Sequence, residues 1–138
     1  MDNQHKSPTT PMNPEIKAQW VAALRSGEYK QGVGYLHRDD TFCCLGVLCD
    51  LAIKAGAPEV EENRHPAGSM STYNGSELVL PSSVMEWAGL SSSDPILVDE
   101  SREVNECLPV SEFNDSGVTF NGGGFTFNEI ADLIEAQL

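Results

Sequence analysis

Three of the four cysteines lie in one short apolar stretch, residues 41 to 52, with the sequence T-F-C-C-L-G-V-L-C-D-L-A. Its residue types predict a helix capped by Asp40 or Thr41. A thiol at the amino end of a helix lies near unpaired backbone N–H groups, whose partial positive charge lowers its pKa and favours the nucleophilic thiolate. Cys43 and Cys44 are at that end. A cysteine nucleophile is therefore the first chemistry that the sequence allows.

Such a nucleophile also requires a histidine base within hydrogen-bond reach and a group that orients the base. For Cys44 the candidate bases are His37 and His65. His65 precedes Pro66 inside a polar segment, not a strand. The competing interpretation is that the cysteines are small apolar residues that fill a helix interface. Because Cys43 and Cys44 point in different directions from a helix, we expect at most one of them to be buried.

A second kind of site is indicated by residues 29 to 35, shortly before the cysteine stretch. Two tyrosines, a glutamine and two glycines favour a short irregular strand or a loop with close backbone approach. Tyrosine rings offer faces for stacking and amides offer hydrogen bonds, so the segment could form a shallow wall for a small ligand. The predicted ligand-binding residues are Tyr29, Gln31, Tyr35, His37 and Cys43. The alternative is that Tyr29 and Tyr35 only cover the core.

Metal and phosphate chemistry have less support. The sequence contains no Cys-x-x-Cys pair, so a zinc site would have to combine the clustered cysteines with Cys107 and a histidine. The glycine clusters lack the strand, lysine and helix that surround a phosphate-binding loop. Asp39 and Asp40 are typical of a turn. We expect no metal and no cofactor.

Charge limits the classes of partner. Eight basic and twenty-one acidic residues give a formal net charge of -13, which opposes contact with phosphate backbones and anionic lipid. No apolar run approaches the roughly 18 to 20 residues that cross a bilayer, and the first residues lack an apolar signal core. We expect no direct nucleic-acid binding, no membrane association and a cytoplasmic location. The acidic residues either coat solvated loops or form a surface that mimics nucleic acid and binds a basic protein.

Caps and periodicity predict the elements that position these residues. They are a helix from Asn13-Pro14 to Gly27, the cysteine helix ending at Gly56, a surface loop over residues 57 to 70, a tight turn at Asn74-Gly75 before a strand at 77 to 80, a helix with a Ser83 and Glu86 capping box ending at Gly89, an edge strand at 95 to 98, and a closing helix with a Thr126 and Glu129 capping box. The packed face of the cysteine helix is expected to contain Cys44, Val47, Leu48, Leu51 and Ala55.

These elements predict an α+β fold, with three to four helices around the central cysteine-rich helix and a small antiparallel β-sheet. Residues 13 to 138 are expected to form a single globular domain. Residues 1 to 12 are polar, contain two prolines and show no periodicity, so they are expected to form a disordered tail.

Two resemblances extend this interpretation. The fragment at residues 42 to 47 is similar to the nucleophile turn of papain-like cell-wall peptidases, which implies Cys44 as nucleophile and Gly46 as the following glycine, with Cys43 where that family usually has aspartate. A wider pattern resembles a group of small uncharacterised proteins of bacteriophages and prophage-bearing bacteria over residues 14 to 138. Its residues are Trp20, 24 to 32, 42 to 52, Leu80-Pro81, 87 to 90, Asn114-Asp115 and 127 to 135.

The wider resemblance implies a phage-type accessory protein that acts inside a bacterial host cell and binds a host protein or a small ligand, with anti-defence as one such role. The first hypothesis is therefore a non-enzymatic binding protein. The alternatives are a cysteine-dependent hydrolase that uses Cys44 with His37 or His65, and a small-nucleotide-binding protein with its site near Tyr29, Gln31 and Tyr35. The sequence leaves a homo-oligomer open.

Overall fold

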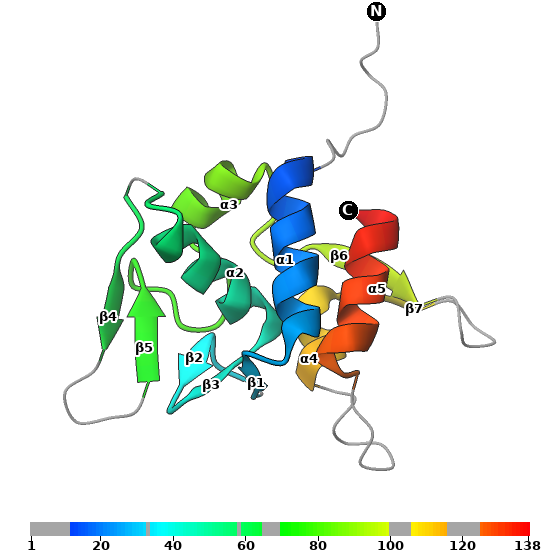
Figure 1. Ribbon diagram of the computed structural model, residues 1–138, viewed down its shortest axis with the longest axis horizontal. Helices are drawn as coiled ribbons and strands as arrows, with labels where there is room; N and C mark the ends of the chain where they lie inside the picture. The colour runs from blue at the N-terminus through cyan, green and yellow to red at the C-terminus, as the bar shows by residue number, and fades with distance from the viewer. Residues whose placement is uncertain (1–11, 33, 58, 65–69, 100–105, 116–124) are drawn as a thin grey trace, which may run out of the picture.

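The computed structural model describes residues 12–32, 34–57, 59–64, 70–99, 106–115 and 125–138, and in this part of the chain the fold is α+β, as predicted (Figure 1). In the described ranges four helices accompany the cysteine helix, in agreement with the predicted three to four. The helices are α1 (Pro14–Ser26), α2 (Cys44–Lys54), α3 (Ser82–Ala88), α4 (Val110–Asp115) and α5 (Phe127–Gln137). The strands are β1 (Lys30–Gln31), β2 (His37–Arg38), β3 (Thr41–Phe42), β4 (Glu62–Arg64), β5 (Met70–Tyr73), β6 (Ile96–Asp99) and β7 (Glu106–Pro109).

The first and last helices form where their caps predict. Asn13 Oδ1 accepts hydrogen bonds from the backbone N–H groups of Glu15 and Ile16, at 2.9 and 3.3 Å, and α1 ends at Gly27 with a left-handed φ of 82°. Helix α5 begins with the complete Thr126 and Glu129 capping box. The two helices run antiparallel, side by side (Figure 1), and bury their apolar faces in the same core.

Helix α2 differs from the prediction at its start. Thr41 and Phe42 pair with Arg38 and His37 as strand β3, so they are extended and the helix cap falls on Cys43 instead of Asp40 or Thr41. All residues from 44 to 49 are buried, whereas Ala55 at the other end is exposed. The amino half of α2 is therefore enclosed on every side, and a single packed face describes only part of it.

Both adjacent cysteines are buried, so the expectation that at most one would be is wrong. Cys43 is 2% exposed and Cys44 has no exposed surface. Cys43 is the extended residue before α2, and its backbone N–H donates to the Leu36 carbonyl, whereas Cys44 Sγ lies 3.7 Å from the carbonyl oxygen of Val110. A helix that crosses the middle of a core has no solvent side.

The main sheet has the order β1-β3-β2-β5-β4. Its strands are antiparallel except for β1 and β3, which are parallel, so the sheet is mixed and not wholly antiparallel as predicted. A surface loop was predicted over residues 57 to 70, but strand β4 and the first residue of β5 lie in this range. The second sheet is the antiparallel pair β6 and β7, which contains the predicted edge strand.

The turn at Asn74 and Gly75 is confirmed, with φ angles of 51° and 86°. The strand predicted after it at residues 77 to 80 does not form, because β5 already pairs with β2 on one edge and β4 on the other. The predicted capping box of α3 is also wrong. Ser83 Oγ accepts a hydrogen bond from Asn74 Nδ2, and the residue at the cap position is Pro81.

The buried apolar residues form one cluster, with Trp20, Tyr73 and Phe113 as its largest fully buried side chains. Met12 belongs to that cluster, so the predicted tail does not include it, and the rest of the tail lies outside the described residues. Near the carboxyl end, the Gln137 side chain pairs with the Val98 backbone through two hydrogen bonds of 2.7 Å. Within the described ranges, no helix combines the length and apolar character of a membrane span.

Candidate functional site

Cys44 lies at a junction of three helices. Its backbone N–H donates to Asn114 Oδ1 of α4 at 3.3 Å, and its carbonyl accepts from Trp20 Nε1 of α1 at 2.9 Å. The thiol has no exposed surface, so no substrate can reach it in the folded state. The structure gives Cys44 a packing role, in keeping with the alternative that the cysteines fill a helix interface.

Gly46, which the peptidase resemblance interprets as part of a nucleophile turn, has a steric role in this fold. A methyl group built on Gly46 would lie 1.8 Å from the carbonyl oxygen of Leu36. Only glycine lets the backbone before β2 pass this close to α2. The packing of Leu36 against α2 is therefore enough to explain why position 46 is a glycine, and no nucleophile turn is needed.

A network of side-chain amides holds strand β1, which follows α1, in place. Gln31 Nε2 donates to Asn114 Oδ1 and to the Phe125 carbonyl, both at 3.0 Å, and Gln31 Oε1 accepts from the N–H of Phe127 at 3.1 Å. Asn114 Nδ2 donates to the Gly32 carbonyl at 2.8 Å. The amide of Gln31 is thus used inside the protein and not held free for a ligand. Asn114 belongs to the wider resemblance pattern, but its local sequence indicates first a turn asparagine, so its role in this network was not predicted.

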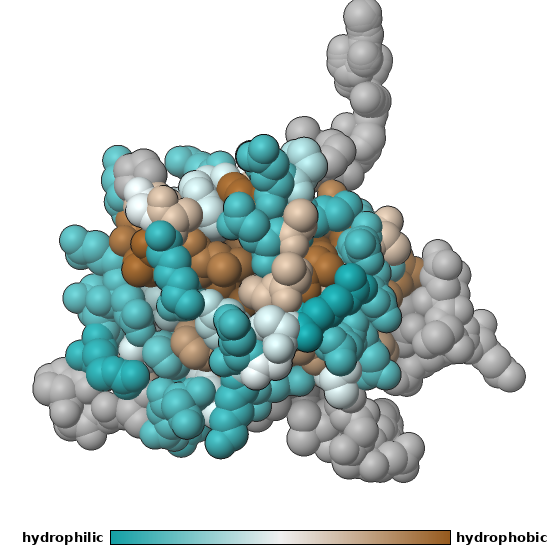
Figure 2. All heavy atoms as spheres, in the orientation of Figure 1, coloured by the Kyte–Doolittle hydropathy of each residue, from teal (hydrophilic) through white to brown (hydrophobic). Residues whose placement is uncertain are grey.

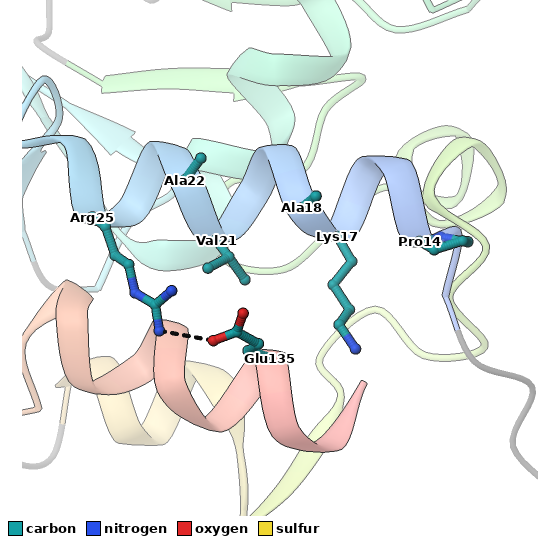
Figure 3. A pocket seen from close by; sticks show the side chains of 7 residues that line it. All are labelled: Pro14, Lys17, Ala18, Val21, Ala22, Arg25 and Glu135. Atoms are coloured by element: carbon teal, nitrogen blue, oxygen red, sulfur yellow. Dashed lines mark hydrogen bonds and ion pairs between the residues drawn. The ribbon is translucent and has the colours of Figure 1, made fainter.

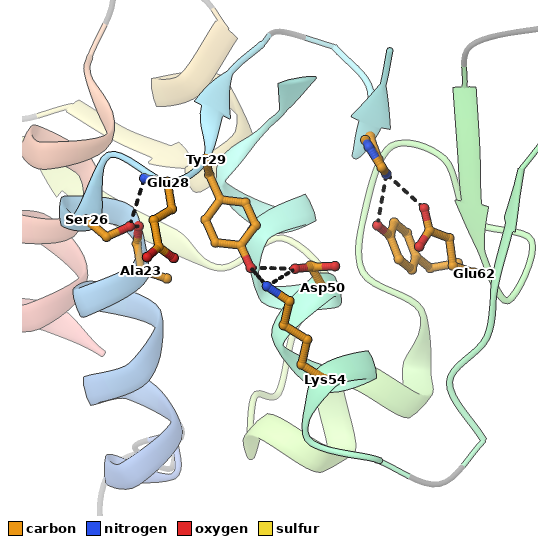
Figure 4. A network of polar contacts seen from close by, with 9 residues as sticks. Ala23, Ser26, Glu28, Tyr29, Asp50, Lys54 and Glu62 are labelled. Carbon is orange, nitrogen blue, oxygen red and sulfur yellow. Dashed lines mark hydrogen bonds and ion pairs between the residues drawn. The ribbon is translucent and has the colours of Figure 1, made fainter. Parts of the chain in front are cut away.

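His37 belongs to a separate polar cluster on the sheet, whose carboxylate, Glu62, is labelled in Figure 4. Its Nδ1 atom lies 2.8 Å from Glu62 Oε2 and 3.4 Å from the Tyr73 hydroxyl, and its ring stacks on Phe42 at 3.9 Å between centroids. The histidine is 9% exposed. It is therefore held by partners other than Cys44. The second candidate base, His65, lies outside the described residues.

Ser71 is opposite His37 in the β2 and β5 register, and its Oγ has no hydrogen-bond partner in the described part of the chain. Glu62 contacts the same imidazole at Nδ1, so the three residue types of a hydrolase triad occur on neighbouring strands. Ser71 has no exposed surface, however, so it cannot meet a substrate. A buried water is the ordinary partner for such a hydroxyl.

Tyr29 joins a third cluster with Asp50 and Lys54 of α2 (Figure 4). The tyrosine hydroxyl donates to Asp50, and Lys54 Nζ lies 3.2 Å from the tyrosine oxygen and 3.2 Å from Asp50 Oδ2. Burial raises the pKa of Tyr29, and hydrogen bonds to Tyr29 and Asp50 raise the pKa of Lys54. The phenol is therefore kept neutral and the lysine charged, which are their unreactive forms.

The buried thiol and phenol near β5 are shifted in the same sense. Burial raises the pKa of Cys49 well above its ordinary value, and nearby Cys43 and carboxylates add to the effect. Burial and the charge of Glu62 raise the pKa of Tyr73. A catalytic nucleophile needs the opposite shift. Among the described groups with a shifted pKa, none is activated for attack.

The predicted ligand wall is only partly assembled. Tyr29 and Gln31 line a hollow of about 240 Å³, whose other lining residues are Leu24, Arg25, Gly27, Thr126, Phe127 and Asn128. Tyr35 lies outside this hollow, where the Arg38 guanidinium is 5.3 Å from its ring centroid. His37 and Cys43 are buried elsewhere. The five predicted residues therefore do not form one site.

A larger groove of about 450 Å³ lies beside this hollow, between α1 and α5 (Figure 3). Six residues of α1 form one wall, and they recur at the three- and four-residue spacing of one helical face. The lining residues are Pro14, Lys17, Ala18, Val21, Ala22 and Arg25 of α1, with Glu135 of α5. Figure 2 shows brown and pale atoms along α1 and toward α5, bounded by teal side chains. Arg25 lines both the groove and the hollow.

The charged residues that line the groove differ in whether they form ion pairs. Arg25 Nη2 contacts Asp132 Oδ1 at 2.5 Å and Glu135 Oε1 at 3.0 Å. Those two carboxylates raise the pKa of the arginine. The ammonium group of Lys17 has no hydrogen bond or ion pair with any residue that the structure describes. This groove was not predicted, although the small residues Ala18 and Ala22 in the sequence of α1 were a signal for it.

The fold and the groove define a small α+β protein with an open apolar groove between its first and last helices. Residues 12–138 match a family model described as Domain of unknown function (DUF8296), and the chain belongs to this family. No curated protein and no solved structure matches the chain. Within the described ranges, no group of three or more histidine, cysteine, aspartate or glutamate residues could hold a metal ion.

Proposed function

We propose that this chain is a non-enzymatic binding protein of the phage accessory type, and that it binds a host protein through the groove between α1 and α5. The observation that carries this proposal is the groove itself, which has an apolar floor and charged rims. Interface centres in protein complexes have this composition, with apolar residues inside and polar residues around them.

The alternatives have weaker support. A hydrolase that uses Cys44 would have to open the core at every turnover, since the thiol is fully buried and His37 is held by Glu62. A nucleotide site at Tyr29 and Gln31 would use a hollow of about 240 Å³, whereas small-molecule pockets usually measure about 300 to 1,000 Å³. The Gln31 amide, moreover, already bonds to Asn114, Phe125 and Phe127.

A protein partner fits the dimensions better. A specific interface buries about 800 Å² on each partner, so the groove would be its centre and the adjoining hollow part of its rim. The net charge of -13 favours a partner with basic residues around the contact. The resemblance to phage proteins makes a bacterial cell the place to look for the partner, with an anti-defence role as one outcome of binding.

The test uses two variants that place the same side chain on exposed alanines. Ala22→Arg fills the groove, and Ala55→Arg modifies the far end of α2. Each protein is used to capture partners from a bacterial lysate, and any protein retained by the wild type is purified and its affinity measured by calorimetry. We expect Ala22→Arg to weaken binding by at least about tenfold, with no change for Ala55→Arg. Partners that bind both variants equally, or no reproducible partner, would overturn the proposal.

A further inference from the structure

We propose that the segment of the partner that occupies the groove is an amphipathic α-helix with a carboxylate on one flank, facing Lys17, and a basic residue on the other, facing Asp132 and Glu135. This inference rests on the proposed function for the location of the site. It adds the shape of the occupant and the order of its charges.

The shape follows from the two walls. The α1 wall repeats at helical spacing, and its central residues Ala18 and Ala22 are small and exposed. Small residues one turn apart leave a shallow groove, into which the side-chain ridge of another helix can pack at close range. Because α1 and α5 run antiparallel (Figure 1), a third helix can lie between them along their common direction. Binding of an amphipathic helix in such a groove is a recurrent mode of protein recognition.

The charges expected on the partner helix follow from the ion pairs that the groove residues already form. Lys17 projects beside the groove without a partner among the described side chains (Figure 3). On α5, the groove residue Glu135 and Asp132, three residues before it, both contact Arg25. Lys17 therefore lacks an anionic partner among the described residues, and the two carboxylates of α5 have one cation between them. An occupant with one acidic and one basic flank supplies both.

The spacing of these charges sets the register of the helix. Lys17 and Arg25 are eight residues apart on α1, which corresponds to about 12 Å along a helix. The carboxylate and the basic residue of the occupant should therefore be about two helical turns apart. The apolar positions between them would contact Ala18, Val21 and Ala22.

The test is a selection from a displayed library of helix-forming peptides in which the stripe and flanking positions vary. The wild-type protein is the target, and Ala22→Arg is used for counter-selection. We expect enriched peptides with apolar residues at three- and four-residue spacing, an acidic residue on one flank and a lysine or arginine on the other. Peptides without helical periodicity, or no enrichment over Ala22→Arg, would overturn the inference.

A charge exchange tests the contact with Lys17 directly. Replacing the acidic residue of a selected peptide by lysine should weaken its binding to wild type by about threefold or more, and Lys17→Glu should restore the affinity. Lys30→Glu changes an exposed lysine outside the groove and is the matched control. If Lys17→Glu does not alter the preferred flank, or if Lys30→Glu alters it equally, the charge order is wrong.

The two experiments fail in different ways. If lysate capture depends on Ala22 but the library yields no helical peptide, this inference is overturned and the groove remains a binding site. If the library yields the expected peptides but lysate capture finds no groove-dependent protein, the proposed cellular function is overturned.

Discussion

The amino half of α2 and the outer face of α1 both place small residues at a helix surface, with opposite results. At Gly46 the protein's own Leu36 backbone fills the space. At Ala18 and Ala22 no described segment covers the helix, and a groove remains. The cysteines, which suggested chemistry, are in the region where packing is complete. The groove beside Ala18 and Ala22 is the better candidate for a binding site, because it is open to a partner.

The largest effect is expected from Gly46→Ala, which places a methyl group against the Leu36 carbonyl. Because backbone cannot move aside as a flexible side chain can, unfolding free energy should fall by at least about 3 kcal/mol in urea denaturation. Gly27→Ala is the control. Its added methyl meets no atom within 4 Å, so it should lose only about 1 to 2 kcal/mol for its left-handed φ. Equal losses would contradict the close-packing explanation.

Asn114→Ala should have the next largest effect. It removes the side-chain acceptor of Cys44 N–H and the side-chain donor to the Gly32 carbonyl, and Gln31 keeps only its bonds to Phe125 and Phe127. We expect a loss of about 3 kcal/mol, measured in urea, because unsatisfied buried polar groups retain their desolvation penalty. Asn63→Ala, on the exposed strand β4, should change stability by less than about 0.5 kcal/mol. A tolerated Asn114→Ala would show that the network does not hold α2 in place.

Stability should also fall at alkaline pH. The pKa values of Cys49 and Tyr73 are raised in the folded protein, so the unfolded chain loses these protons first and unfolding becomes more favourable as pH rises. The decrease should begin near the ordinary thiol pKa of about 8.5 and steepen above about pH 10, by about 1.4 kcal/mol per pH unit for each such group. Tyr73→Phe should flatten the profile above about pH 10. An unchanged slope would remove Tyr73 as a cause.

The smallest effect on stability is expected from Ala22→Arg. The side chain at this position is exposed, and arginine is a good helix former, so unfolding free energy should stay within about 0.5 kcal/mol of wild type. Calorimetric melting with and without a captured partner separates stability from binding. A large loss of stability would mean that part of the protein fills the groove in solution, as the Leu36 backbone fills the space at Gly46.

The ends of the fold could be predicted because their signals are local. Asn13 with Pro14, Gly27, and the Thr126 and Glu129 box satisfy backbone groups only a few residues away. The strand at 77 to 80 could not be predicted correctly, since its absence depends on which edges of β5 are already paired. For the candidate site, sequence indicated Tyr29 and Gln31, which do line a hollow, but it could not show that the Gln31 amide is already used.

By itself, the sequence determined the α+β fold class, the capped starts of α1 and α5 and the tight turn at Asn74. Tertiary structure alone decided that both adjacent cysteines are buried, that β1 runs parallel to β3, and that Ala18 and Ala22 face an open groove. The physical reason is the range of the interactions. Caps and turns are satisfied within a few residues, whereas burial depends on which distant segment covers a surface.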